Sequence, residues 1–488
     1  MERRRAAARL RGRARGGPGV TGAGATGDRS FPDGFLWGVS TSAYQIEGAV
    51  DADGRVPSIW DTYSHTPGKI DGGDTGDVAC DHYRRWREDL DLIASLDVNA
   101  YRFSLAWPRL FAPGERRGFD HYDRLIDGLL GRGVEPVVTL YHWDLPQALE
   151  DEGGWLNRDT AERFAEHAAA CFAAFGDRVR WWLTINEPWI VGLLGYLHGL
   201  HAPGYSDDLR GEVTAFHHLL LAHGRAVQAY RAAGQDGRIG LAPNLMPHYP
   251  ASDDPADVAA SRASDGYVNR WFLDAIFHGA YPDDQRRRYE ERLGPLDFVR
   301  EGDLATIAQP TDYLGVNYYA PRTIQAVPGD RPWPWRVVVP EGVRTTAGFT
   351  GGVASTEAGT PIVPSGLTDL LVRLHRDYPG TPLLVTENGA VFGDGPGPDG
   401  RVHDGRRVDF IHDHLAAVLE ALDAGAPVLG YCHWSLMDNF EWKLGYGQRF
   451  GLVHVDYDTL ARTVKDSGLY YARLARANAL LEPARTCC

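Results

Sequence analysis

The sequence predicts an α/β protein that forms a single (β/α)8 barrel with enlarged loops at one end. Short apolar runs alternate with longer amphipathic runs along most of the chain, and eight apolar runs are present. Most of these runs end in a polar or aromatic residue of chemical interest. Such alternation is typical of a parallel barrel surrounded by helices. The length of 488 residues is compatible with one domain, because these barrels grow through loop insertions.

The eight predicted strands are nearly continuous hydrophobic runs, the pattern of strands that are buried on both faces. They are residues 35–40, 99–104, 134–141, 181–186, 238–243, 312–317, 382–387 and 428–433. Because barrel active sites lie at the carboxyl ends of the strands, the polar residues there are expected to face one site. An open doubly wound sheet is the alternative, but that fold usually has a glycine-rich turn after an early strand, which this sequence lacks.

Amphipathic runs between the strands predict helices over residues 77–95, 158–175, 212–233, 365–378 and 404–424. In the first of these, Val78 begins a series of apolar positions at helical spacing. The segment 318–364 is different, because it is rich in Pro and Gly and has no clear period. It contains Trp333 and Trp335 and is interpreted as a long loop that is functional or serves as a lid.

The two ends of the chain differ in composition from its body. Residues 1–30 are rich in Arg, Gly and Ala and are predicted to be a disordered tail. Residues 31–482 are assigned to the barrel and residues 483–488 to a frayed C-terminus. The tail holds eight arginines, so the body is more acidic than the overall formal charge of -15. An acidic body argues against nucleic acid as the main partner.

The five cysteines match neither a zinc-ligand spacing nor a disulfide framework. They are interpreted as reduced thiols, which favours the cytoplasm, and Cys432 is expected to be buried in its apolar run. The tail lacks the apolar stretch of a secretory signal, and no apolar run is long enough to cross a membrane. We therefore expect no membrane partner, whereas the oligomeric state is not predicted.

Two glutamates stand at strand ends in similar surroundings. Glu187 lies in T-I-N-E-P, residues 184–188, and Glu387 lies in V-T-E-N-G, residues 385–389. The fourth and seventh strands of a barrel lie across its mouth from each other, so the two carboxyl groups can flank a sugar ring. Retaining glycosidases need such a pair about 5–5.5 Å apart, one to protonate the leaving oxygen and one to attack the anomeric carbon.

The pair also explains how one residue can serve as acid and then as base. The ionised nucleophile raises the pKa of its partner, which keeps the partner protonated for the first step. Once the glycosyl-enzyme has formed, that negative charge is gone, and the partner can activate water. For either motif alone, a surface glutamate at a strand end is an equally good interpretation.

Seven stretches of this sequence resemble glycoside hydrolase family 1, the β-glucosidase family, in the order that the family has them. The similarity runs from about Phe31 to about Leu481. The stretches are F-P-D-G-F-L-W-G-V-S-T-S-A-Y-Q-I-E-G (31–48), Y-R-F-S-L-A-W-P-R (101–109), L-Y-H-W-D-L-P (140–146), T-I-N-E-P-W (184–189), G-V-N-Y-Y (315–319), V-T-E-N-G (385–389) and H-W-S-L-M-D-N-F-E-W (433–442).

The resemblance implies roles for the residues around the two carboxyl groups. Glu187 is implied as the acid/base and Glu387 as the nucleophile. Asn186 is implied to bind the sugar 2-hydroxyl, a contact that strengthens in the transition state. Tyr319 is implied to hydrogen-bond the nucleophile. Arg102 is implied to keep the nucleophile ionised, since a buried carboxylate without a partner is costly.

The resemblance also implies a set of substrate-binding residues and no metal or other cofactor. Gln45, His142 and Glu441 are implied to bind the 3-, 4- and 6-hydroxyls. Trp434 and Trp442 are implied as walls of the sugar site, because the C–H face of a sugar packs on an aromatic ring. Asn317, at a strand end, is placed in the same group. Other tryptophans are interpreted as packing residues, namely Trp143, Trp181 and Trp182.

The implied activity is hydrolysis of terminal β-glucosides with retention, with small β-glycosides and oligosaccharides as substrates. A phospho-β-glucosidase is one alternative. A catalytically silent barrel that binds glycans is another, although such proteins typically lose one of the two glutamates and both are present here. The sequence departs from the family at Gly359-Thr360, where the family often has Gly-Trp. That Trp normally forms a platform for the aglycone, which Trp333 or Trp335 could replace.

Overall fold

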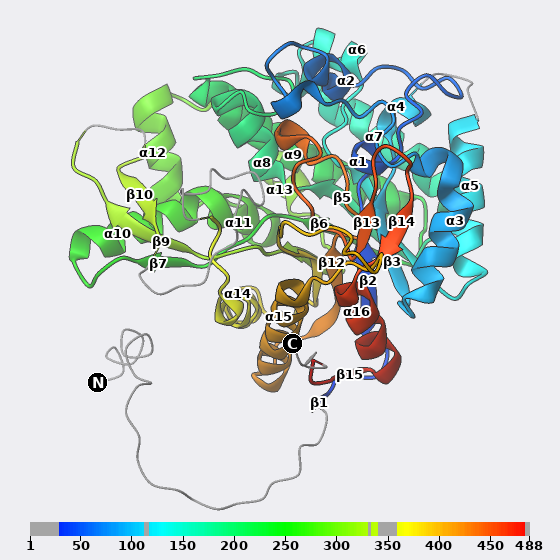
Figure 1. Ribbon diagram of the computed structural model, residues 1–488. Coiled ribbons are helices and arrows are strands. Elements are labelled where there is room, and N and C mark those ends of the chain that lie inside the picture. Colours follow the sequence, from blue (N-terminus) through cyan, green and yellow to red (C-terminus); the bar gives the residue numbers. More distant parts are fainter. Residues whose placement is uncertain (1–28, 112–116, 330–332, 340–358, 484–488) are drawn as a thin grey trace, which may run out of the picture.

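The computed structural model describes residues 29–111, 117–329, 333–339 and 359–483. Its centre is a parallel eight-stranded barrel (Figure 1). Every strand lies within two residues of its predicted run, so the (β/α)8 fold is confirmed. The strands are β2 (Leu36–Ser40), β3 (Ala100–Ser104), β4 (Glu135–Tyr141), β5 (Trp181–Asn186), β6 (Arg238–Ala242), β8 (Leu314–Asn317), β11 (Leu383–Asn388) and β12 (Val428–Trp434).

The strands follow the order β6-β5-β4-β3-β2-β12-β11-β8, and main-chain hydrogen bonds close the ring between its two ends. The Asp312 amide donates to Ile239 O at 2.9 Å, and the Asn317 amide donates to Pro243 O at 3.1 Å. Closure leaves no free sheet edge and brings the carboxyl ends of all eight strands to one face.

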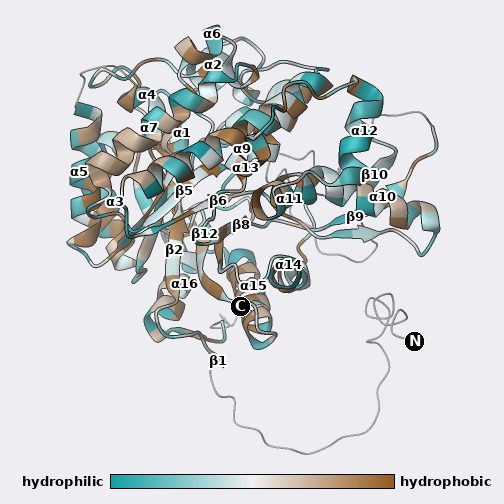
Figure 2. Cartoon of the chain, turned by 180° about the vertical axis from the view of Figure 1, so that it is seen from behind, coloured by the Kyte–Doolittle hydropathy of each residue, from teal (hydrophilic) through white to brown (hydrophobic). Residues whose placement is uncertain are grey.

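Helices surround the barrel as predicted. The longer ones are α3 (His82–Ser95), α5 (Arg117–Leu130), α7 (Asp159–Phe175), α9 (Leu209–Ala232), α10 (Pro255–Asp265), α12 (Asp283–Leu293), α14 (Pro364–Asp377), α15 (Gly405–Asp423) and α16 (Asp466–Ala477). Shorter helices are α1 (Ala43–Ile46), α2 (Ile59–Ser64), α4 (Trp107–Leu110), α6 (Gln147–Asp151), α8 (Pro188–Gly192), α11 (Trp271–His278) and α13 (Asp303–Ile307). Figure 2 shows that α12 is largely hydrophilic.

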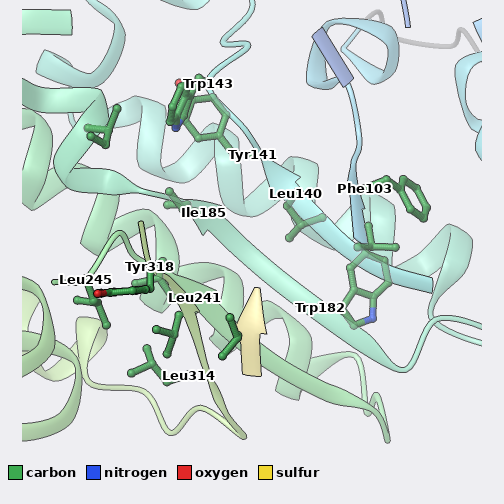
Figure 3. Close-up of a cluster of buried hydrophobic side chains, with 14 of the residues drawn as sticks. Phe103, Leu140, Tyr141, Trp143, Trp182, Ile185, Leu241, Leu245, Leu314 and Tyr318 are labelled. Carbon is green, nitrogen blue, oxygen red and sulfur yellow. The ribbon is translucent and has the colours of Figure 1, made fainter. Parts of the chain in front are cut away.

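The strands are buried on both faces, which explains why they read as continuous apolar runs. Inside the barrel, side chains from six strands or strand ends form one layer, namely Ala100, Val137, Leu183, Ala242, Tyr313 and Leu384. Outside it, Trp182 packs edge-on against Phe172 of α7 at 5.0 Å between ring centroids. Figure 3 shows part of the large outer cluster, including Trp182, Leu140 and Ile185. The expectation that Cys432 is buried is confirmed.

Two expectations from the sequence are wrong in detail. The first predicted helix begins at His82 and not at residue 77, because residues 77–80 form turns and Asp81 has a φ of 52°. Val78 is therefore outside the helix and 55% exposed.

The segment 318–364 is not one long loop. Its described parts include β9 (Arg322–Ala326) and β10 (Trp335–Val338), which form a small sheet with β7 (His248–Pro250).

The remaining strands lie outside the barrel. β13 (Val453–Val455) pairs with β14 (Arg462–Val464), and β1 (Arg29–Ser30) pairs with β15 (Ala479–Leu480). The rest of the predicted disordered tail and most of the predicted frayed C-terminus lie outside the described residues. In the described part of the chain, no helix is long and apolar enough to cross a membrane.

Candidate active site

The predicted site residues meet at the carboxyl end of the barrel. Arg102 lies on β3, Asn186 ends β5, Asn317 ends β8, Glu387 lies near the end of β11, and Trp434 ends β12. The others follow strands closely: His142 comes one residue after β4, Glu187 one residue after β5, and Tyr319 two residues after β8. Gln45 belongs to α1, and Glu441 and Trp442 lie in the segment after β12. The rule for strand ends thus locates most of the site.

Glu387 is held at both of its carboxylate oxygens. Arg102 Nη1 donates to Oε1 at 2.5 Å, and the Tyr319 hydroxyl donates to Oε2 at 2.6 Å. Both Glu387 and Arg102 are buried, so the ion pair is shielded from solvent. A guanidinium and a phenol on opposite oxygens fix the orientation of the carboxyl group through charge-assisted hydrogen bonds. The arrangement suits a nucleophile.

Glu187 is bound by two amides rather than by a cation. Asn317 Nδ2 donates to its Oε1 at 2.8 Å, and Asn244 Nδ2 donates to the same atom at 3.3 Å. The main chain of Glu187 has a φ of 47°, a conformation that is uncommon for a non-glycine residue and often marks a functional site.

The protonation behaviour of Glu187 differs from that of an ordinary glutamate. Burial, followed by the negative charge of Glu387, raises the pKa of Glu187 well above its usual value. The amides of Asn317 and Asn244 and the charge of Arg102 oppose this shift without cancelling it. A buried carboxyl group whose pKa is raised beside a second carboxyl group is suited to act as a general acid.

Asn186 connects the two glutamates. Its Oδ1 accepts hydrogen bonds from Arg102 Nη2 at 2.7 Å and from Asn317 Nδ2 at 3.0 Å. Its Nδ2 lies 3.2 Å from His142 Nε2. The side-chain amide of Asn186 is therefore fixed between Arg102, which binds Glu387, and Asn317, which binds Glu187. In this position it can orient a substrate hydroxyl.

A second group of polar side chains lies around Gln45. Its Nε2 donates to Asn439 Oδ1 at 2.9 Å, to Phe440 O at 2.8 Å and to Glu441 Oε2 at 3.3 Å. Burial and the charge of Glu387 raise the pKa of Glu441 to about 8, which also places Glu441 near the nucleophile. These groups can bind several hydroxyls of one sugar.

Aromatic rings line the same region. The rings of His142 and Trp434 are stacked at 5.7 Å between centroids, and those of His142 and Trp442 at 6.1 Å. Trp143 packs against Trp442 at 4.6 Å and donates from Nε1 to Asn186 O at 3.0 Å. Trp143 thus packs against site residues and holds them in place, in line with its interpretation as a packing residue.

Glycine is required in the motif that carries Glu387. A Cβ on Gly389 would lie 1.7 Å from Trp434 O, so no larger residue fits between β11 and the end of β12. The close approach brings the strand of the nucleophile against the strand of Trp434.

Sequence reasoning missed three residues that hold the site. Asn244 contacts Glu187, Thr386 Oγ1 donates to Asn317 Oδ1 at 2.6 Å, and Asn439 accepts from Gln45. Asn244 follows β6 by two residues, so the strand-end rule would have found it one position beyond the predicted run. Thr386 and Asn439 lie inside the quoted motifs next to residues that were chosen.

The tryptophans of the segment 318–364 lie against other aromatic rings. Trp333 packs on Tyr267 at 4.1 Å and on Trp335 at 5.3 Å between centroids. Thr360 is half-buried. In the described part of the chain, no group of three or more His, Cys, Asp or Glu could hold a metal ion.

The family model described as "Glycosyl hydrolase family 1" matches residues 27–480. The chain belongs to glycosyl hydrolase family 1. It is a glycoside hydrolase, and the resemblance seen in the sequence motifs is confirmed.

Within glycosyl hydrolase family 1, the chain is similar to "Thermostable beta-glucosidase B" of Thermobispora bispora, with 47% identity over 93% of each chain. It is 44% identical to a "Bifunctional beta-D-glucosidase/beta-D-fucosidase" of Bifidobacterium breve, over 91% of this chain and 97% of the relative. Among solved structures, the family 1 β-glucosidase of Thermotoga maritima superposes with a TM-score of 0.87. That match has 43% identity and covers 93% of this chain and 100% of the other.

Proposed function

We propose that this family 1 enzyme is a retaining β-glucosidase in which Glu387 is the nucleophile and Glu187 is the acid/base. The observation that carries the proposal is the contrast between the two carboxyl groups. Glu387 is bound by a cation and a phenol, whereas burial and the charge of Glu387 raise the pKa of Glu187. The names of the relatives, which include β-glucosidases, support glucose as the sugar.

In the first step, a Glu387 oxygen forms a bond to the anomeric carbon while the bond to the aglycone oxygen breaks. Glu187 gives its proton to that oxygen, and the aglycone leaves as an alcohol. In the second step, Glu187 takes a proton from water, and the water oxygen displaces Glu387. Two inversions give net retention. Asn186, Asn317, Gln45, His142, Glu441, Trp434 and Trp442 are the proposed sugar-binding residues.

The position of Glu441 argues against 6-phospho-β-glucosides as substrates. Burial and the charge of Glu387 already raise the pKa of Glu441, so a phosphate dianion there would add a further negative charge beside two acidic groups, whereas neutral hydroxyls can bond to Glu441. We expect higher efficiency on plain β-glucosides. The cytoplasmic location, the absence of a nucleic-acid partner, and the assignment of residues 31–482 to one barrel domain stay predictions.

Removal of the acid/base tests the proposal. Glu187→Ala is expected to lose most activity on phenyl β-glucoside, because a poor leaving group needs the proton. A dinitrophenyl β-glucoside should still glycosylate the variant, and azide should accelerate turnover and give β-glucosyl azide, measured by mass spectrometry and NMR. Glu150→Ala is the control, because Glu150 is also buried with a raised pKa, to about 7, but binds Tyr205. Equal loss on both substrates without azide rescue would exclude this role.

A further inference from the structure

Arg322, the first residue of β9, is a buried cation without a counter-charge. It is 8% exposed, and its side chain makes no hydrogen bond or ion pair with any described residue. Its Cζ lies over the ring of Trp189, 4.9 Å from the centroid. Burial lowers the pKa of Arg322 to about 10. Buried charges in proteins are normally paired, so the open guanidinium indicates a missing anionic partner.

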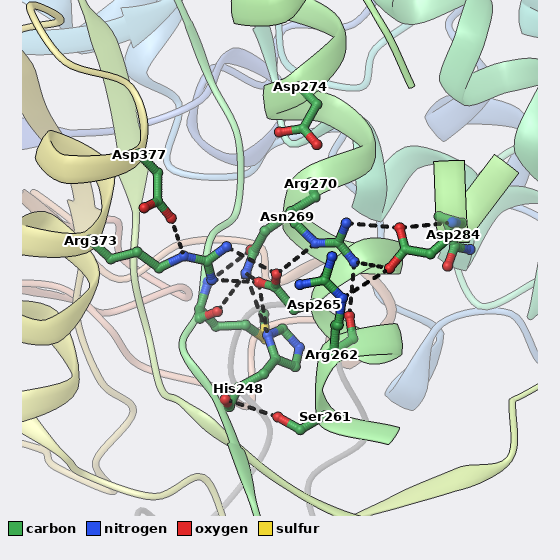
Figure 4. Close-up of polar contacts among 12 residues, drawn as sticks. His248, Ser261, Arg262, Asp265, Asn269, Arg270, Asp274, Asp284, Arg373 and Asp377 are labelled. Atoms are coloured by element: carbon green, nitrogen blue, oxygen red, sulfur yellow. Dashed lines mark hydrogen bonds and ion pairs between the residues drawn. The ribbon is translucent and has the colours of Figure 1, made fainter. Parts of the chain in front are cut away.

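Two carboxylates that contact neighbours of Arg322 are already bound by other groups. Asp265 accepts from Arg373 Nη1 at 2.5 Å and from Arg270 Nε at 3.1 Å, as Figure 4 shows. Glu212 accepts a short hydrogen bond from the hydroxyl of Tyr267. The protein thus neutralises two other arginines in this region and leaves Arg322 unpaired.

Further polar groups around Arg322 are buried without a partner. His248 and Arg322 are opposite each other in the register of β7 and β9, and the charge of Arg322 contributes to the lowered pKa of His248. His248 Nε2 and Trp189 Nε1 have no hydrogen-bond partner among the described residues. A cation and two ring nitrogens therefore lie together with unused hydrogen-bonding capacity.

Three short connections lead from the acid/base to this group. Trp189 follows Glu187 by two residues. Asn244, which donates to Glu187, precedes His248 by four residues, and Asn317, which also donates to Glu187, precedes Arg322 by five. These residues follow β5, β6 and β8, which are neighbours in the closed barrel, whereas Gln45 follows β2 on the other side of the ring. Arg322 therefore lies on the Glu187 side of the barrel mouth. Because Glu187 protonates the leaving oxygen, this is the aglycone side.

We propose that Arg322 binds a carboxylate on the aglycone, so that the enzyme favours β-glucosides of acidic phenols and related acids. The proposal rests on the proposed function. A guanidinium presents parallel N–H groups to a carboxylate and can bind both oxygens. Such a ligand would supply the counter-charge that Arg322 lacks, and its aromatic ring could pack near the rings of this region.

A matched pair of substrates tests the proposal, namely 4-carboxyphenyl β-glucoside and its neutral amide, 4-carbamoylphenyl β-glucoside. In Arg322→Gln, kcat/KM for the carboxylate is expected to fall about tenfold or more relative to the amide, which is the size of a lost charge-assisted hydrogen bond. Arg288→Gln is the control, because Arg288 also lies over a tryptophan, Trp335, at 5.8 Å. An unchanged ratio in Arg322→Gln, or the same change in Arg288→Gln, would overturn the proposal.

Inhibition of the wild-type enzyme tests the proposal even if Arg322→Gln does not fold. Free 4-hydroxybenzoate should inhibit about tenfold more strongly than 4-hydroxybenzamide, and high salt should reduce the difference. Equal inhibition constants would overturn the proposal. Failure of the proposed function is distinguishable, because the enzyme would then not hydrolyse 4-nitrophenyl β-glucoside either.

Discussion

Glu441, a proposed sugar-binding residue, is expected to make the stability of the folded protein depend on pH. It is buried beside Gln45 and near Glu387, and these surroundings raise its pKa to about 8. In the unfolded chain the pKa of the same group is about 4.3. Between these values the folded protein holds a proton that the unfolded chain has lost, so the contribution of Glu441 to stability decreases as the pH rises.

Glu441→Gln should remove this pH dependence. The contribution of Glu441 to the free energy of unfolding changes by at most about 1.4 kcal/mol per pH unit. Glutamine has nearly the same shape as glutamate, so the packing should be kept. The free energy of unfolding of the variant minus that of the wild type is expected to increase from pH 5 to pH 8, measured by urea unfolding at each pH. A difference that stays constant over this range would show that Glu441 is not protonated in the folded protein. Activity on β-glucosides should fall.

At the residue scale, the sequence identified the groups that carry chemistry better than the groups that orient them. Glu187 and Glu387 stand out because each follows an apolar strand within a specific motif. Asn244 and Thr386 act through contacts with Glu187 and Asn317. Those contacts depend on how neighbouring strands are aligned, and a single sequence does not contain that alignment.

At the scale of elements, a buried ion cluster fixes the segment after β12 that carries Glu441 and Trp442. Lys465 Nζ donates to Asp438 Oδ1 at 2.8 Å and to Asp394 Oδ1 at 2.7 Å. Asp394 follows β11, so the cluster connects the segment after the nucleophile with the segment after β12. Lys465 is fully buried, and the loss of its charge would leave two carboxylates without this partner.

Lys465→Met is therefore expected to reduce the free energy of unfolding by roughly 3–5 kcal/mol, as in other buried pairs with one partner removed. It should also raise KM for 4-nitrophenyl β-glucoside, because Glu441 and Trp442 lose their support. Lys443→Met is the matched control. Lys443 forms an exposed pair with Asp71, and such pairs contribute about 1 kcal/mol or less. Similar losses in both variants, by urea unfolding, would contradict the assigned role of the cluster.

Thr360 stands in the segment before α14 where family members often have Trp. Threonine has no flat apolar face for a second sugar, so disaccharides should bind weakly on the aglycone side. Thr360→Trp is expected to lower KM for cellobiose about two- to tenfold, the value of about 0.5–1.5 kcal/mol of aromatic stacking. KM for 4-nitrophenyl β-glucoside should change little, because this activated substrate depends less on the platform.

The loop tryptophans offer the alternative explanation for disaccharide binding. If Trp333→Ala or Trp335→Ala abolishes cellobiose binding in the parent enzyme, those rings provide the platform instead. Trp333 packs on Tyr267 at 4.1 Å, so we expect its loss to affect stability more than cellobiose binding. Unchanged cellobiose kinetics in Thr360→Trp would also be evidence against the assignment.

At the scale of the whole molecule, the barrel was predictable because its strands are buried on both faces. Such strands are continuous apolar runs, which differ clearly from the helical spacing of the segments between them. The start of α3 was not predictable, since the apolar spacing continues through Val78 although the chain turns at residues 77–80. β9 and β10 were missed because they are short strands outside the barrel, in a region rich in Pro and Gly. Burial of a strand on both faces thus leaves a stronger pattern in the sequence than hydrogen-bonded pairing of short strands does.

The barrel also brings together two glutamates that are far apart in sequence, and in the proposed mechanism they perform one double displacement. A 2-deoxy-2-fluoro-β-glucoside with an activated leaving group should trap the intermediate of the first step. Peptide mass spectrometry of the inactivated protein should find one label per chain, on Glu387. A label on another residue, with Glu387 unmodified, would show that Glu387 is not the nucleophile.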